Sequence, residues 1–115
     1  MELASIELTA IVSILNNVLE GYYINNIYRI DENTILVRFH HSERPDRRLM
    51  VSSGRGVWLT NSDLVKEGTK GIIPTLRRKL SRARFIEVEH PAGERIIIIK
   101  FRSSGEFYKL IGEFF

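Results

Sequence analysis

Five basic residues fall within a stretch of this chain that holds no acidic residue, between Leu76 and Phe85. They are Arg77, Arg78, Lys79, Arg82 and Arg84. Lysine and arginine side chains gathered in this way suit the phosphate backbone of a nucleic acid. The alternative is an ordinary solvated surface, on which these side chains pair with Glu87, Glu89 or the rim of a sheet.

An acid and a guanidinium stand together at Glu94 and Arg95, directly after the turn-forming segment Pro91-Ala92-Gly93. The arginine fork can donate to a phosphate or to the edge of a base, while the carboxylate orients the arginine or accepts from a base amine. A surface ion pair is the plainer interpretation. The residues alone leave both open.

Other kinds of chemistry find little support. His40 and His41 are neighbours on an expected strand and so point to opposite faces, and His90 is distant in the sequence, so we predict no metal site. The chain has no cysteine, which excludes thiolate ligands and cysteine nucleophiles. Acidic residues fall mainly in expected turns, and no phosphate-binding or nucleophile-elbow motif occurs. We therefore predict no catalytic residue and no cofactor.

Size and composition predict one globular domain. The 115 residues are 43% hydrophobic and 27% charged, and 17 basic residues against 14 acidic ones give a net charge of +3. The longest apolar run, Ile96 to Ile99, is far too short to span a membrane. The N-terminus lacks the pattern of a secretion signal. We expect a soluble cytoplasmic domain.

The elements that position these residues are one helix, seven short strands and a second helix. Apolar residues recur at helical spacing from Leu8 to Leu19, with Ser5 as the N-cap and Gly21 placed to end that helix in a left-handed conformation. The spacing of Leu76, Leu80 and Ala83 predicts the second helix, with Arg78 and Arg82 opposite this apolar stripe.

Strand patterns alternate with turn signals along the rest of the chain. The predicted strands are Tyr22 to Ile30, Thr34 to His40, Arg48 to Ser52, Val57 to Thr60, Phe85 to His90, Arg95 to Phe101 and Phe107 to Phe115. The isoleucine-rich sixth strand is expected to be buried on both faces. We predict a mostly-β α+β domain, a two-layer sheet or sandwich with a helix at an end or edge. Because the chain stops inside an apolar strand pattern, we expect a fragment of a longer protein.

Several stretches in order resemble the N-terminal domain of the NFACT family, the fibronectin-binding protein A-like factors of ribosome quality control. They are Leu19-Glu20-Gly21-Tyr22 with Ile27-Tyr28, the segment from Gly71 to Leu80, Gly93-Glu94-Arg95-Ile96, Phe107-Tyr108-Lys109-Leu110 and Glu113-Phe114-Phe115. The resemblance covers nearly the whole chain. It implies a fold similar to the N-terminal domain of formamidopyrimidine-DNA glycosylases.

The resemblance also implies a function and partners. Members of the family bind large ribosomal subunits obstructed by peptidyl-tRNA, recruit a ubiquitin ligase in some lineages, and bring in tRNA so that the stalled peptide is tailed at its C-terminus. In the family an Asp-Arg pair and an early aspartate support tRNA recruitment. Glu94-Arg95 and Glu7 fall at those places here, each acid one methylene longer. The resemblance thus implies tRNA contacts at Glu7, Glu94 and Arg95, with the basic cluster supplying backbone charge. It implies a binding module and not an enzyme, because peptide-bond formation in the family belongs to the ribosome.

Two other functions remain to be weighed. A DNA glycosylase-like repair domain is suggested by the implied fold and by Met1-Glu2-Leu3, but the chain lacks the N-terminal proline that serves those enzymes as nucleophile. A fibronectin-binding adhesin domain is suggested by the family's other name, but no secretion signal or wall anchor supports it.

Overall fold

One helix packs against seven antiparallel strands in the computed structural model, which describes residues 5–60 and 78–113, and the side chains of residues 9–60 and 78–112. The elements are α1 (Ser5–Val18), β1 (Tyr23–Asp31), β2 (Thr34–His40), β3 (Arg47–Ser52), β4 (Gly56–Thr60), β5 (Arg84–Glu89), β6 (Ile96–Ser103) and β7 (Glu106–Glu113). The seven predicted strands and the first helix are confirmed, each within a residue or two where its ends are described.

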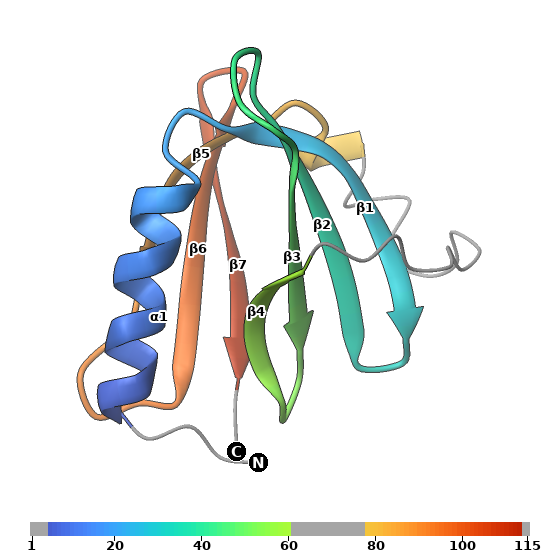
Figure 1. The fold of residues 1–115 in the computed structure, drawn as a ribbon. Helices are drawn as coiled ribbons and strands as arrows, with labels where there is room; N and C mark the ends of the chain where they lie inside the picture. Colours follow the sequence, from blue (N-terminus) through green and yellow to red (C-terminus); the bar gives the residue numbers. More distant parts are fainter. Residues whose placement is uncertain (1–4, 61–77, 114–115) are drawn as a thin grey trace.

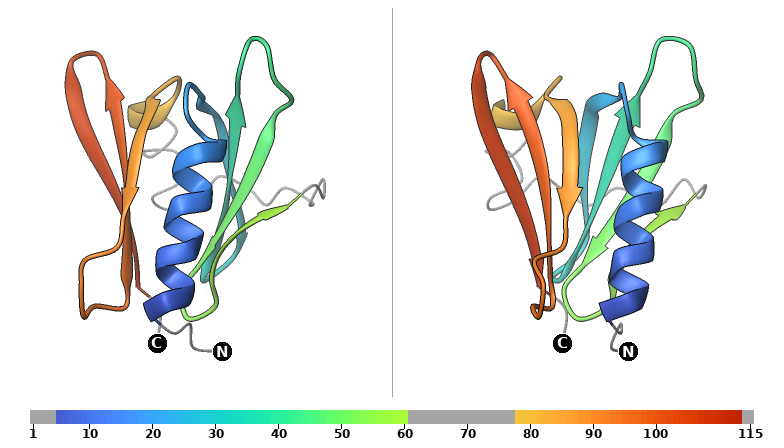
Figure 2. Two further views of the ribbon diagram at one scale, coloured as in Figure 1. Left: turned by 60° about the vertical axis from the view of Figure 1, so that its left-hand side comes forward. Right: turned by 90° about the vertical axis from the view of Figure 1, so that its left-hand side faces the viewer.

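The strands form one sheet in the order β4-β3-β2-β1-β5-β6-β7, and this sheet is nearly divided in two. Tyr23 and Arg84 are the single register pair between β1 and β5. Beyond that pair the two strands diverge, so that β1–β4 and β5–β7 form two splayed halves with α1 in the opening between them (Figures 1 and 2). The predicted mostly-β architecture is confirmed, with the helix between the two halves and not at an edge of the sheet (Figure 2), while the similarity to the glycosylase domain stays a prediction.

Helix α1 supplies polar contacts that a neighbouring strand would otherwise make. The side-chain amide of Asn16 donates to the carbonyl of Val88 at 3.0 Å and accepts from its N–H at 2.8 Å. Because Val88 lies in β5 where β1 has already diverged, the asparagine satisfies two backbone groups that lack a strand partner on that side. Leu15 of α1, and Leu19 just after the end of α1, are buried in the core between the two halves of the sheet.

The core lies between the two halves of the sheet. It includes buried side chains from α1 and β1–β6, and the partly buried Tyr108 and Leu110 of β7 pack against it. Phe39 of β2 is fully buried, with its ring centroid 6.3 Å from that of Phe85 and 6.2 Å from that of Phe101. A smaller cluster of Tyr28, Leu36 and Met50 lies on the opposite face of β1–β3. The aromatic contacts therefore join the halves where strand pairing does not.

Turn geometry agrees with the expectation after α1 and at the last hairpin. Gly21 has a φ of +83°, which confirms its left-handed conformation, although α1 itself ends at Val18. Ser104 and Gly105 both have positive φ, as in the type I′ turns that connect tightly paired strands. That turn places β7 beside β6 along its whole length.

The prediction that Arg82 and Arg84 lie on a helix is wrong. Helical geometry is described only at residues 78–80, Arg82 has a φ of +63°, and Arg84 begins β5. The backbone N–H of Arg82 donates to the carbonyl of Ile24, and the backbone N–H of Ile24 donates to the carbonyl of Ala83. Pairing with β1 thus replaces the hydrogen bonds that a continuing helix would have made. Leu80 and Ala83 are buried, as their spacing predicted.

Burial of β6 on both faces is also wrong. Ile97, Ile99 and Phe101 are buried, but Ile96, Ile98 and Lys100 on the other face are only partly covered. Lys100 there lies 2.6 Å from Glu89 and 3.8 Å from Glu87, and the hydrogen bond to Glu89 raises its pKa. The outer face of β5–β7 is therefore a partly exposed surface on which charged side chains alternate with apolar ones, and not a second buried layer.

Candidate nucleic-acid interface

Four side chains form a row across the outer face of the sheet, one from each of four neighbouring strands. Tyr23 of β1 is opposite Arg84 of β5, which is opposite Arg102 of β6, which is opposite Phe107 of β7. Residues directly opposite one another in a ladder point to the same face, about 5 Å apart. We call Tyr23, Arg84, Arg102 and Phe107 the aromatic–arginine row.

Each arginine at this end of the sheet lies beside an aromatic ring or beside another arginine. The guanidinium of Arg82 is 5.7 Å from the ring centroid of Tyr23, and that of Arg102 is 5.7 Å from the ring centroid of Phe107. Both distances fall in the range of cation–π contacts. The strand pairing, in addition, sets Arg84 directly beside Arg102.

These arginines line a groove of about 580 Å³ together with Ser81 and the turn that follows β6. Its lining residues are Ser81, Arg82, Arg84, Arg102, Ser103, Ser104 and Gly105. Within residues 9–60 and 78–112, no carboxylate forms an ion pair with Arg82, Arg84 or Arg102. Since like charges directly opposite in a sheet destabilise it, the pairing of Arg84 with Arg102 favours an anion as the missing partner.

The predicted basic cluster is only partly brought together. Arg82 and Arg84 line the groove, while Arg78 and Lys79 are exposed on the helical residues before it. Arg77 lies outside the described residues. The sequence carried no signal for Arg102, Phe107 and the serines of this groove, because the order of residues along the chain does not indicate which residue of β6 lies opposite Arg84.

The second predicted site, Glu94 and Arg95, lies in the loop between β5 and β6. Both side chains are exposed. The backbone carbonyl of Glu94 is 2.7 Å from Nε2 of the His90 ring, and the backbone N–H of Glu94 donates to the carbonyl of Pro91 at 3.2 Å. These local bonds hold the loop in the turn that its Pro-Ala-Gly sequence predicted.

This loop lies at the same end of the molecule as the start of α1, whose first turn contains Glu7 (Figures 1 and 2). The side chain of Glu7 is outside the described part. The groove lies at the other end of β6, and the eight residues of that strand span about 25 Å. One small ligand cannot reach both places, but a folded RNA can.

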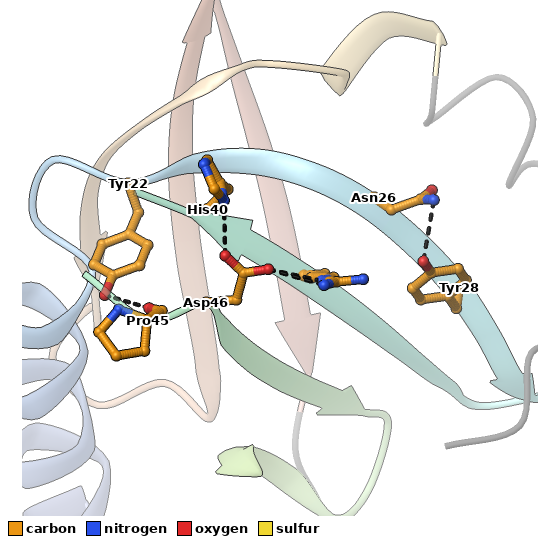
Figure 3. A network of polar contacts seen from close by, with 7 residues as sticks. Tyr22, Asn26, Tyr28, His40, Pro45 and Asp46 are labelled. Carbon is orange, nitrogen blue, oxygen red and sulfur yellow. Dashed lines mark hydrogen bonds and ion pairs between the residues drawn. The ribbon is translucent and has the colours of Figure 1, made fainter. Parts of the chain in front are cut away.

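A third polar cluster holds the loop after β2 (Figure 3). Asp46 accepts from His40 Nδ1 at 2.7 Å and from Arg38 Nε at 3.1 Å, and the Tyr22 hydroxyl donates to the carbonyl of Pro45 at 2.8 Å. Partial burial disfavours the ionised form of Asp46, but the two hydrogen bonds outweigh it and hold its pKa below the ordinary value of 3.8. These residues satisfy one another, which indicates a structural role.

The three histidines have separate partners. His40 contacts Asp46, the ring of His41 packs 5.1 Å from that of Tyr22, and His90 contacts the backbone of Glu94. In the part of the chain that the structure describes, no three His, Asp or Glu side chains converge as metal ligands. The same residues include no helix that is long and apolar enough to cross a membrane.

Residues 5–115 match the family described as NFACT N-terminal and middle domains. The chain belongs to this family. Among its relatives, the archaeal Rqc2 homolog aRqcH of Methanocaldococcus jannaschii is 25% identical over 99% of this chain and 18% of its own length. Ribosome quality control complex subunit 2 of Saccharomyces cerevisiae is 30% identical over 98% of this chain and 11% of its own length. The NFACT chain thus spans less than a fifth of these relatives.

Solved structures show the same fold. The N-terminal domain of the fibronectin-binding protein PavA from Streptococcus pneumoniae superposes with a TM-score of 0.84 at 24% identity, covering 94% of this chain and 44% of that one. The N-terminal part of the fibronectin/fibrinogen-binding protein from Streptococcus suis gives a TM-score of 0.80 at 26% identity, covering 94% and 43%. The mostly-β α+β fold expected from the sequence is therefore confirmed.

Proposed function

We propose that this NFACT chain is an RNA-binding module of a longer ribosome quality-control factor, which contacts tRNA on obstructed large ribosomal subunits. The observation that carries the proposal is the groove, where three arginines from different parts of the chain meet without a carboxylate among the described residues. A phosphate backbone supplies the negative charge that such a surface lacks. The names of the relatives direct the proposal to the ribosome.

The two ends of β6 have different roles in this proposal. Arg82, Arg84 and Arg102 hold the RNA backbone at one end, and Glu94 with Arg95 contacts a specific part of the tRNA at the other. Backbone contacts position a nucleic acid without reading it, whereas contacts with bases and shape supply selectivity. Support of C-terminal tailing, and recruitment of a ubiquitin ligase in some lineages, belong to the longer protein.

The test is fluorescence anisotropy of this chain with labelled tRNA and with duplex DNA of equal length, over a series of salt concentrations. We expect tRNA to bind more tightly at matched salt, and Arg95→Ala to remove that advantage. Arg84→Gln is expected to weaken both ligands and to reduce the slope of log K against log salt by about 0.7–0.9. Equal losses from both variants on both ligands would mean a nonspecific patch.

Fibronectin binding is a second candidate, favoured by the name of the 26% identical Streptococcus suis neighbour. A pull-down of fibronectin by the same chain tests it. Retention of fibronectin at physiological salt, with no preference for tRNA over DNA, would replace the first proposal by this one.

A further inference from the structure

Phe107 is the most exposed large apolar side chain in the described part of the molecule. It is 70% exposed and lies on β7, an edge strand of the sheet. An aromatic ring left in water gains nothing from burial and adds nothing to the core. Its exposed ring is therefore available to a partner.

The surroundings of Phe107 are basic and not apolar. Ile111 is the next large apolar residue along the outer face of β7, and the exposed Lys109 lies between them. Across the ladder Phe107 is opposite Arg102, whose guanidinium is 5.7 Å from its ring. A ring bordered by cations suits an anionic aromatic ligand better than an apolar protein surface.

The spacing within the row fits one nucleotide. Neighbouring strands are about 4.8 Å apart, so Arg84 and Phe107 are separated by about 10 Å with Arg102 between them. A base whose phosphate lies between the two arginines is therefore within reach of the Phe107 ring, on the face that Arg102 does not cover. Arginine and aromatic side chains together are the usual partners of a phosphate and a base that has left its stack.

A base must be unpaired to stack in this way. In a duplex each base face is covered by its neighbours, and the backbone phosphates alone are accessible to a flat sheet surface. An arginine contacts single-stranded and double-stranded RNA alike, whereas the ring of Phe107 distinguishes them.

We propose that Arg84, Arg102 and Phe107 form a subsite for an unpaired RNA nucleotide, with the phosphate between the two guanidinium groups and the base stacked on the Phe107 ring. The proposal rests on the proposed RNA-binding function and defines its ligand at the groove. It adds a base-stacking residue that the basic cluster alone does not contain.

The experiment measures anisotropy of a labelled, unstructured single-stranded RNA and of the same strand annealed to its complement, with the 115-residue chain. We expect Phe107→Ala to weaken binding of the single strand by about 5- to 150-fold, which corresponds to the loss of one base stack, and to leave the duplex within twofold. Phe107→Trp is expected to retain single-strand binding, and Phe107→Leu to lose it, since leucine keeps apolar contact without a π-face.

Two control variants separate stacking from other effects. Ile111→Ala removes an exposed apolar side chain from the same strand and is expected to leave both affinities unchanged. Arg102→Gln is expected to weaken single strand and duplex together. Circular dichroism of every variant verifies the fold.

The outcomes distinguish this proposal from the proposed function. If Phe107→Ala or Phe107→Leu binds the single strand as the unmodified chain does, the stacking subsite is refuted, while a tRNA preference lost in Arg95→Ala leaves the proposed function standing. If the single strand binds through Phe107 but tRNA shows no advantage over duplex DNA, the subsite stands and tRNA recognition fails. If neither RNA binds, both fail.

Discussion

The junction between the two halves of the sheet depends on aromatic packing more than on strand pairing. One register pair joins β1 to β5, with three backbone hydrogen bonds between residues 22–24 and 82–85. Phe39 contacts Phe85 at a centroid distance of 6.3 Å, nearly perpendicular, and Phe101 at 6.2 Å. Replacing Phe39 by leucine keeps the site apolar and removes both aromatic contacts.

The expected loss of unfolding free energy is the sum of the stabilisation that the contacts of Phe39 with Phe85 and Phe101 supply. An aromatic pair contributes about 0.5–1.5 kcal/mol beyond its buried area, so Phe39→Leu should lower the free energy of unfolding by about 1–3 kcal/mol. A domain of this length has a free energy of unfolding of about 6–17 kcal/mol, at about 0.05–0.15 kcal/mol per residue. The variant therefore remains folded and measurable.

Urea unfolding followed by circular dichroism measures this loss, and a double-mutant cycle with Phe101→Leu isolates one contact. We expect a coupling energy between Phe39 and Phe101 of about 0.5–1.5 kcal/mol. Phe107→Leu is the control, because its ring is 70% exposed and its replacement should change stability by less than about 0.5 kcal/mol. A coupling energy near zero would refute the idea that aromatic packing joins the halves.

Two further predictions concern the loop after β2 and the turn after α1. Asp46→Asn should cost about 1 kcal/mol of unfolding free energy at pH 7. Because the pKa of Asp46 is lowered in the folded state, its contribution to stability is complete above pH 3.8 and is lost as the pH falls through the folded-state pKa. The difference in unfolding free energy between Asp46→Asn and the unmodified chain, measured by urea unfolding, should therefore be smaller at pH 3 than at pH 7. Gly21→Ala should lower the melting temperature more than Gly54→Ala does. Both glycines have positive φ, +83° at Gly21 and +80° at Gly54, but of the two only Gly21 has a side chain near the added Cβ, His41 Nε2 at 3.1 Å. Equal losses would mean that the contact with His41 relaxes freely.

The sequence by itself determined the local structure, because that depends on near neighbours. Helical spacing of apolar residues predicts α1, and β-branched runs broken by Asp31-Glu32-Asn33 and Ser103-Ser104-Gly105 predict the hairpins that the structure contains. The basic residues, the Glu94-Arg95 pair and the family resemblance were likewise visible in the chain. These features led to the correct family and fold class.

The tertiary structure decided which of these residues meet. Helical spacing extended the second helix through Arg82 and Arg84, but hydrogen bonds to β1 end it, because a strand edge offers partners that no local pattern reveals. The register of β5, β6 and β7 then sets Arg84, Arg102 and Phe107 in one row and leaves Arg95 at the far end of β6. Strand pairing joins residues distant in the chain, so only the folded sheet could define the groove and separate it from the Glu94-Arg95 loop.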